Sequence, residues 1–445
     1  MSINRPTFLK KELALSSSPY LYTSKQLKAY AVEINHRDPV DGDLLQKALD
    51  RTLERMPYLS DTFVNDGRAF YYAENPLPME AAHFHGIRQV GGKETNYHML
   101  DVTWDDHTTW FTMFHGFCDG QGIYFFLETV IYYYYCLKDG KEYDPNGIRT
   151  HLDPMTDAET LDPITVKYSV DPEFKMPEGG SQKKPYSLPE TQEGPEDEVR
   201  DYGIRIPSGE LMSFVKGLNS SPSVVISMLV CEAIQKVHPE CDAPIVANIP
   251  LSARKILDCP KTFKNCSNRV LLPITGTPMD AMPFEQKAAA LRGVLKMQLN
   301  PNILRTVYNN IMGPKYIERM TTPGDYWETV EQSNKSMSMI CHDTFYTDYI
   351  GSLHTTEYTP QITGIHFLCA PPMEGKLHLN IIEHNGSFQI NCLAHFDISV
   401  YVNALMDVLA EHGLGAERDP DRRFSLPRTQ WRDSMGLIET GNLNT

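Results

Sequence analysis

The sequence predicts an α+β fold built from two halves of similar size. Its 445 residues exceed the length at which one hydrophobic core usually stops growing, so two domains of about 200 residues are expected. Candidate helices and strands do not alternate strictly, which favours an α+β layered arrangement in each half. Between about Val170 and Tyr202, prolines alternate with glycines and an acidic run. This composition predicts an exposed crossover between the halves.

The N-terminal half, placed at residues 1–170, opens with a clear helix. Asp41 or Asp43 can cap it, apolar residues repeat at helical spacing, and Pro57 ends it. Extended segments are expected at 69–73 and 97–103. The run Thr108–Phe114 is rich in aromatic and β-branched residues, which suits a buried strand. After a glycine-rich turn, the sequence predicts an aromatic helix over 123–137.

The C-terminal half, placed at residues 203–415, repeats this mixture. Helices are expected at 208–218 and 222–237, followed by a strand at 245–250. Two alternating segments, 376–382 and 387–394, flank Asn385-Gly386, a strong hairpin signal. A helix then begins at Asp397 or Ser399 and closes at Gly413. The crossover occupies 171–202, and residues 416–445 are expected to form a polar tail on the surface.

Composition excludes several classes of function. Lys and Arg total 41 against 57 Asp and Glu, a formal charge of −16, which disfavours binding to nucleic acid or to an anionic membrane. The nine cysteines form no close C-x-x-C pair, so reduced thiols in the cytoplasm fit better than a disulfide scaffold or a zinc site. The N-terminus has no signal-peptide pattern, and the most apolar segment is too short to span a bilayer.

The segment from Phe114 to Gly122 carries the sharpest chemical signal. His115 follows a predicted buried strand and enters a glycine-rich turn. Its side chain can take up and return a proton near neutral pH, and glycines let a substrate approach the turn closely. Asp119 lies four residues further on and is a candidate to orient His115, although the spacing leaves its direction open.

This order of strand, His115-x-x-x-Asp119-Gly120 and apolar helix resembles the active-site signature of the chloramphenicol-acetyltransferase-like superfamily. That superfamily includes carrier-dependent condensation domains, alcohol acyltransferases and plant hydroxycinnamoyl-type acyltransferases. Supporting stretches occur in the same order along residues 10–413. They are 41–59, 248–254, 265–270 and 348–353.

The resemblance implies two related α+β halves, a pseudo-dimer, that meet at a central cleft with a tunnel open at both ends. His115 would be the general base of an acyltransferase. The acyl group would come from acyl-coenzyme A or a carrier-protein pantetheine thioester, used as co-substrate without a permanently bound cofactor, and would pass to a hydroxyl or amine acceptor. Asp119 would pair with Arg254 of the second half as a structural clamp, and Gly120 would allow the turn.

Departures from the family pattern narrow the hypothesis. Phe114 precedes His115 where condensation domains usually have a second histidine, and no carrier domain or D-F-G-W-G motif is evident. A free-standing acyltransferase is therefore favoured. Two alternatives stay open: a non-catalytic binding protein with this fold, and a condensation-type partner that acts in trans on carrier-bound substrates.

Other features have plainer explanations. Cys118 is a candidate nucleophile, but a small buried thiol in a turn is commoner. His366 and His378 could face the tunnel, although core or surface positions are commoner, and the histidine spacing predicts no metal site. The aromatic helix fits a core better than an acyl-chain box. A basic patch could meet coenzyme A phosphates or an acidic carrier protein, with a solvated loop as the default. It comprises Arg254, Lys255, Lys261 and Lys264.

Overall fold

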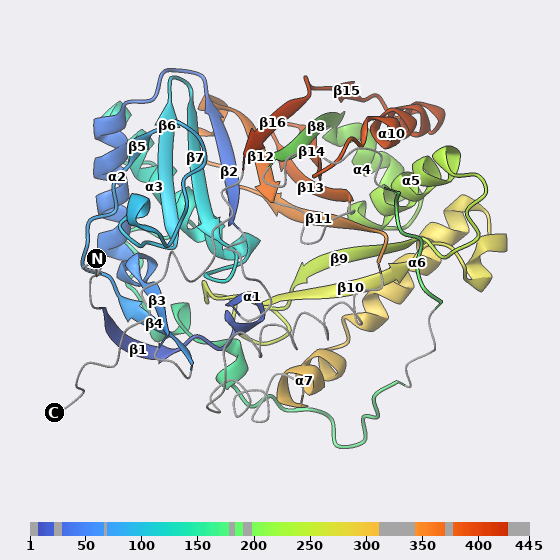
Figure 1. Cartoon of the computed structure of the whole chain (residues 1–445), viewed down its shortest axis with the longest axis horizontal. Coiled ribbons are helices and arrows are strands. Elements are labelled where there is room, and N and C mark those ends of the chain that lie inside the picture. The colour runs from blue at the N-terminus through green and yellow to red at the C-terminus, as the bar shows by residue number, and fades with distance from the viewer. Residues whose placement is uncertain are drawn as a thin grey trace, which may run out of the picture.

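A computed structural model describes residues 8–21, 29–65, 69–177, 183–189, 198–310, 343–369 and 377–425. Two lobes lie side by side, one made of the blue and cyan elements and the other mainly of green to red ones (Figure 1). Each lobe combines a sheet with helices and has its own large hydrophobic core. The division at 170 and 203 stays a prediction.

The first lobe contains a five-stranded sheet in the order β12-β2-β7-β6-β5 and a three-stranded sheet in the order β1-β4-β3. The helices α2 and α3 contact each other beside the larger sheet (Figure 1). The strands are β1 (Leu9–Leu13), β2 (Ala29–His36), β3 (Thr62–Asn65), β4 (Phe70–Glu74), β5 (Ala82–His83), β6 (Leu100–Asp105), β7 (Thr108–Phe114) and β12 (Ile362–Cys369). The helices are α1 (Ser18–Leu21), α2 (Gly42–Arg55) and α3 (Gly120–Asp139).

The second lobe is built on an eight-stranded sheet in the order β10-β9-β11-β13-β14-β8-β15, with β16 also paired to β8. Only β11 runs parallel to its neighbours, β9 and β13. The strands are β8 (Glu198–Pro207), β9 (Val246–Ser252), β10 (Ser267–Pro273), β11 (Phe345–Ser352), β13 (Leu377–His384), β14 (Ser387–Ala394), β15 (Glu417–Arg418) and β16 (Arg422–Ser425). The helices are α4 (Ser208–Gly217), α5 (Pro222–Val237), α6 (Phe284–Gln298), α7 (Pro301–Asn310) and α10 (Ser399–Glu411).

The two lobes interlock through β12, which comes late in the sequence but belongs to the first sheet. It pairs antiparallel with β2, whose other neighbour is β7. Ile350 of β11 and Ile382 of β13 also pack against the first core. The end of β7 therefore lies in a rigid sheet that strands from both halves of the chain support.

Several elements match their sequence expectations closely. The ranges of β7, α5 and β14 are those predicted, and α2 has Asp41 as its N-cap, with the carboxylate accepting a hydrogen bond from the Leu44 N–H at 3.0 Å. Other boundaries differ. The helix α3 begins at Gly120 rather than at 123, because Asp119 caps it. The strand β6 begins at Leu100 rather than at 97, where Tyr97 has a positive φ of 64°.

Strands lie inside both the expected tail and the expected crossover. Within 416–445, β15 and β16 pair with β8 and extend the second sheet, because the N–H and C=O groups of an outer strand can still take partners. Residues 426–445 lie outside the described ranges. The strand β8 itself begins at Glu198, inside the expected crossover of 171–202.

Candidate active site

The turn between β7 and α3 presents His115. Phe114, the last residue of β7, is fully buried, so the histidine leaves the sheet from a fixed base. Gly116 has no room for a side chain, because a Cβ there would lie 2.3 Å from the Phe114 ring. The turn ends at Asp119, whose Oδ1 accepts a hydrogen bond from the Gly122 N–H at 2.9 Å and so begins α3.

Asp119 and Arg254 form a buried ion pair between the lobes. Arg254 Nη1 lies 2.7 Å from Asp119 Oδ2, which also accepts a hydrogen bond from the Cys266 N–H at 2.9 Å. Burial alone raises the pKa of Asp119, but Arg254 and the backbone N–H groups of Cys266 and Gly122 outweigh it and lower that pKa below its usual value. The carboxylate is therefore charged and occupied by these donors.

Arg254 uses its whole guanidinium group in this clamp. Besides Asp119, it donates to the carbonyl oxygens of Thr262 at 2.9 Å and Lys264 at 2.8 Å. Further bonds reach Ser252 Oγ at 3.2 Å and the Phe263 carbonyl at 3.5 Å. With a side chain only 2% exposed, Arg254 acts as the centre of a folded loop rather than as a surface cation.

Aromatic rings from two segments fix the imidazole of His115. The Tyr20 ring stacks on it, with centroids 4.5 Å apart, and the Tyr30 ring meets it edge-on at 5.0 Å. Asn265 Nδ2 donates to the carbonyl oxygens of His115 and Gly116, each at 3.0 Å. The second half of the chain thus holds the backbone of the turn that carries the histidine.

The role of Gly120 in the turn stays a prediction. Its φ is not positive, and a Cβ there would meet Ile350 Cγ2 at an ordinary 3.6 Å. Gly122 has no room for a side chain, because a Cβ would lie 2.3 Å from the Phe263 carbonyl oxygen. Close approach of the loop from the second half, and not the turn conformation, explains this restriction.

The second sheet brings two further titratable side chains near the site. His378 of β13 is 4% exposed, and burial, with a smaller contribution from His115, lowers its pKa to about 3. Asp348 of β11 has its pKa raised to about 7 by burial and then by the charge of Asp119. The sequence leaves open whether His378 faces the tunnel or the core, because strand alternation alone does not show which lobe a face meets.

Cys118 and the aromatic helix have structural roles. The Cys118 thiol is fully buried and donates to Met113 Sδ at 3.7 Å, and burial raises its pKa, which disfavours the nucleophilic thiolate. The tyrosines of α3 lie in the first core. Tyr132, for example, donates from its hydroxyl to the Tyr143 carbonyl at 2.7 Å.

The expected basic patch is largely absent as a surface. Arg254 is buried against Asp119, and Lys264, with a side chain 1% exposed, pairs with Glu12 at 2.7 Å. Lys255 and Lys261 remain exposed. The four cations are close in the sequence, but the side chains of Arg254 and Lys264 are buried.

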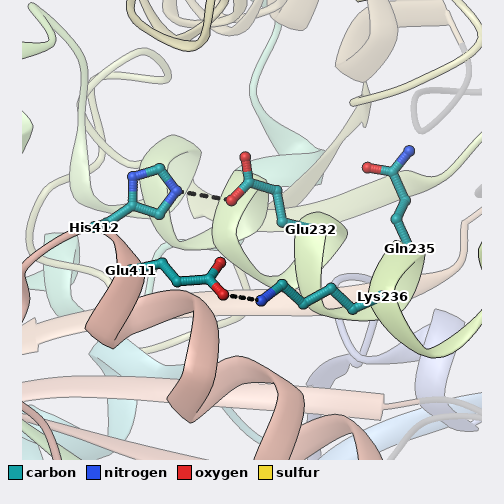
Figure 2. A pocket seen from close by; sticks show the side chains of 5 residues that line it. All are labelled: Glu232, Gln235, Lys236, Glu411 and His412. Atoms are coloured by element: carbon teal, nitrogen blue, oxygen red, sulfur yellow. Dashed lines mark hydrogen bonds and ion pairs between the residues drawn. The ribbon is translucent and has the colours of Figure 1, made fainter.

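Away from the His115 turn, the described residues include a surface pocket but no metal cluster. They contain no group of three or more His, Cys, Asp or Glu side chains that could hold a metal ion. Figure 2 shows a pocket between α5 and α10, on the helix-covered face of the second sheet. His412 pairs there with Glu232 at 2.8 Å, and Lys236 with Glu411 at 2.5 Å, so its charged groups already have partners.

No single helix in the described ranges is long and apolar enough to cross a membrane. The helices α4 and α5, bent at 91° to each other, reach the length and apolar composition of a membrane span only when they are taken together. Both helices contribute to the second core. A cytoplasmic location stays a prediction.

No family model and no curated protein matches the sequence, but solved structures do. Trichothecene 15-O-acetyltransferase from Fusarium sporotrichioides matches with a TM-score of 0.58 at 11% identity, over 91% of this chain and 94% of that one. The first condensation domain of the calcium-dependent antibiotic synthetase matches with a TM-score of 0.57 at 12% identity, over 92% and 96%. The chain has the chloramphenicol-acetyltransferase-like fold.

A third match, F. sporotrichioides TRI101 complexed with coenzyme A and T-2, has a TM-score of 0.56 at 12% identity, over 93% of this chain and all of that one. Because these alignments cover nearly the whole chain, the predicted α+β class and two-lobed arrangement are confirmed. Identities this low establish the chloramphenicol-acetyltransferase-like fold and leave the reaction to the chemistry of the site.

Proposed function

We propose that the protein is an acyltransferase that moves an acyl group from a thioester to a hydroxyl or amine, with His115 as the general base. The observation that carries this proposal is the placement of His115 at the end of β7, between the two lobes, while Arg254 and backbone N–H groups occupy the carboxylate of Asp119. In this proposal Asp119 and Arg254 hold the turn in place, and the imidazole of His115 takes up the proton of the acceptor.

The proposed reaction needs one proton carrier. The imidazole of His115 takes the proton from the acceptor as its oxygen or nitrogen attacks the thioester carbonyl. The resulting tetrahedral intermediate collapses as the C–S bond breaks, and the proton returns from His115 to the departing sulfur. A thiolate is a far better leaving group than an alkoxide, because a thiol is much more acidic than an alcohol.

The structural neighbours support the same chemistry. One is named as an O-acetyltransferase, one is a condensation domain, and one is complexed with coenzyme A. We therefore propose acyl-coenzyme A or an acyl-carrier pantetheine thioester as the co-substrate. Lys255 and Lys261, the exposed members of the basic patch, are the candidates for its anionic part.

The test is thiol release from acyl-coenzyme A and acyl-pantetheine donors in the presence of a panel of alcohols and amines. We expect His115→Ala to reduce acceptor-dependent turnover at least about a hundredfold, the lower end of what a general base contributes. Cys118→Ala serves as the matched control from the same turn and should retain turnover, because its buried thiol is not a nucleophile. Melting temperatures of both variants check that the fold survives.

The outcomes also separate the alternatives. Wild-type turnover in His115→Ala would refute the mechanism. Absence of turnover with every donor in the wild-type protein would favour a non-catalytic binding protein. Turnover with a carrier-bound donor but not with acyl-coenzyme A would favour a condensation-type partner that acts in trans.

A further inference from the structure

One face of β13 carries polar side chains toward the first lobe. Leu377, Leu379 and Ile381 pack in the second core, so His378 and Asn380, which alternate with them, point the other way. Ile382 lies on this same face and packs in the first core. His378 is 4% exposed and Asn380 is fully buried, which places both at the junction of the lobes.

The residues that lie opposite His378 and Asn380 on the neighbouring strands belong to the same face of the sheet. Tyr346 of β11 lies opposite His378 on one side and opposite Asn248 of β9 on the other. The Tyr346 and His378 rings have centroids 5.3 Å apart. Asp348, two residues along β11, lies opposite Asn380. Two adjacent rows of polar residues therefore cross the sheet.

These buried side chains carry an unusual number of unsatisfied atoms. Within the described residues, both ring nitrogens of His378, both amide atoms of Asn380 and Oδ1 of Asn248 have no hydrogen-bond partner. Such groups lose their hydration on burial without compensation, so folded proteins rarely gather several of them. Asn391, on the next strand in the row of Asn380, shows the ordinary situation, because its Nδ2 donates to both carboxylate oxygens of Asp201.

The charge of this region restricts what can satisfy those atoms. His378 lies within electrostatic reach of His115 and is neutral at pH 7, since burial lowers its pKa to about 3. A neutral imidazole has one donor and one acceptor nitrogen, and Asn380 also offers both kinds of group. Asn248 offers its acceptor Oδ1, because its Nδ2 already donates to Asp343 Oδ2 at 2.8 Å. The carboxyl group of Asp343 bonds to Asn248, and that of Asp348 lies opposite Asn380, so this region disfavours an anion.

We propose that Asn248, His378 and Asn380 form a substrate subsite near His115 for a neutral group that both donates and accepts hydrogen bonds, such as a carboxamide or neighbouring hydroxyls. The subsite rests on the proposed function, in which His115 marks the reacting centre. The group can belong to the pantetheine arm of the donor, which carries amides, or to a polar acceptor. An aliphatic alcohol without further polar groups does not fit it.

The stability of the ligand-free protein tests the first half of this proposal. Asn380→Leu removes the unsatisfied atoms and keeps the number and branching of the side-chain heavy atoms, so its melting temperature should equal or exceed that of the wild-type protein. Asn391→Leu is the matched control on the adjacent strand and should melt at a lower temperature, because it leaves Asp201 without those hydrogen bonds. Equal losses in the two variants would show that Asn380 is structural and would overturn the proposal.

Binding tests the second half and separates the two sources. Calorimetric titrations use pantetheine as the donor probe, glycerol and N-acetylglucosamine as acceptor probes, and 1-octanol as the apolar probe. We expect at least one polar probe to bind, and Asn380→Leu and His378→Phe to weaken that probe at least tenfold, while His378→Phe retains the ring beside Tyr346. Binding of octanol alone, binding of none of the probes, or unchanged affinity in both variants would overturn the proposal. Because no turnover is involved, the result is independent of whether His115 acts as a base.

Discussion

At the scale of single residues, the Asp119–Arg254 ion pair connects the turn after β7 to the segment that follows β9. Asp119 and Arg254 are nearly fully buried and 2.7 Å apart. The remaining hydrogen-bonding capacity of both groups is taken by backbone atoms and Ser252. A buried pair of this kind adds little net stability, but removal of one partner leaves an uncompensated charge.

Asp119→Ala is therefore expected to lower the free energy of unfolding by about 3–5 kcal/mol, because Arg254 would remain buried without its partner. Denaturant titration measures this loss. The matched control is Glu357→Ala, which removes an exposed ion pair with Lys141 at 3.0 Å and should cost no more than about 1 kcal/mol. Similar losses in both variants would argue against the clamp.

Asp348 gives the site a pH-dependent stability. Its folded-state pKa of about 7 exceeds the ordinary 3.8, owing to burial and then to Asp119. As pH rises from about 4 to about 7, the unfolded chain ionises while the folded protein keeps this proton, so stability falls across that window. Asp348→Asn removes this dependence. In urea titrations, the free energy of unfolding of Asp348→Asn should exceed that of the wild-type protein by an amount that grows up to about pH 7 and then levels off. A difference that does not change with pH would contradict the assignment.

Some residues of the candidate site can be predicted from the sequence, and others cannot. His115, Asp119 and Arg254 are recognisable because they stand at fixed places in a motif or beside one. Tyr20 and Tyr30, whose rings contact His115, give no such signal, since an isolated tyrosine looks the same in any core. His378 lies 263 residues after His115 in the chain, and only the strand pairing of the second sheet brings the two near each other.

At the scale of elements, the first turn of α3 shows which glycine the fold needs. Gly122→Ala should lower the free energy of unfolding by about 1–3 kcal/mol, because its Cβ would lie 2.3 Å from the Phe263 carbonyl oxygen. Gly120→Ala, the matched change two residues earlier, should stay within about 1 kcal/mol and tend to stabilise the helix. Thermal and denaturant melts compare them, and a larger loss at Gly120 would contradict this account of the turn.

Elements with strong local signals were predicted well, and elements defined by distant pairing were not. The helix α5 and the hairpin strand β14 carry their periodicity and turn residues within themselves. The strands β12 and β16 do not. β12 pairs with β2 of the first sheet and β16 with β8, and neither partnership can be read from a short window of sequence. The same reason explains why the polar composition after Gly413 suggested only a tail.

At the scale of the whole molecule, Arg422 connects the sheets of the two lobes through ion pairs. Arg422 of β16 donates to both carboxylate oxygens of Glu33 on β2, at 2.8 and 2.9 Å. It also reaches Asp201 of β8 at 2.7 Å. Glu33 and Asp201 are buried and belong to different lobes. This bridge connects the lobes in addition to the Asp119–Arg254 pair.

Arg422→Ala should loosen this connection, because it leaves two buried carboxylates without their shared cation. We expect a loss of about 1–2 kcal/mol, below the value for a fully buried network because the Arg422 side chain is 35% exposed. Amide hydrogen exchange should become faster in both β2 and β8. Arg423→Ala is the matched control on the same strand, where a more exposed side chain lies 3.6 Å from Glu198, and should leave exchange in β2 unchanged. Faster exchange in β8 alone would mean that Arg422 supports only the edge of the second sheet and does not couple the lobes.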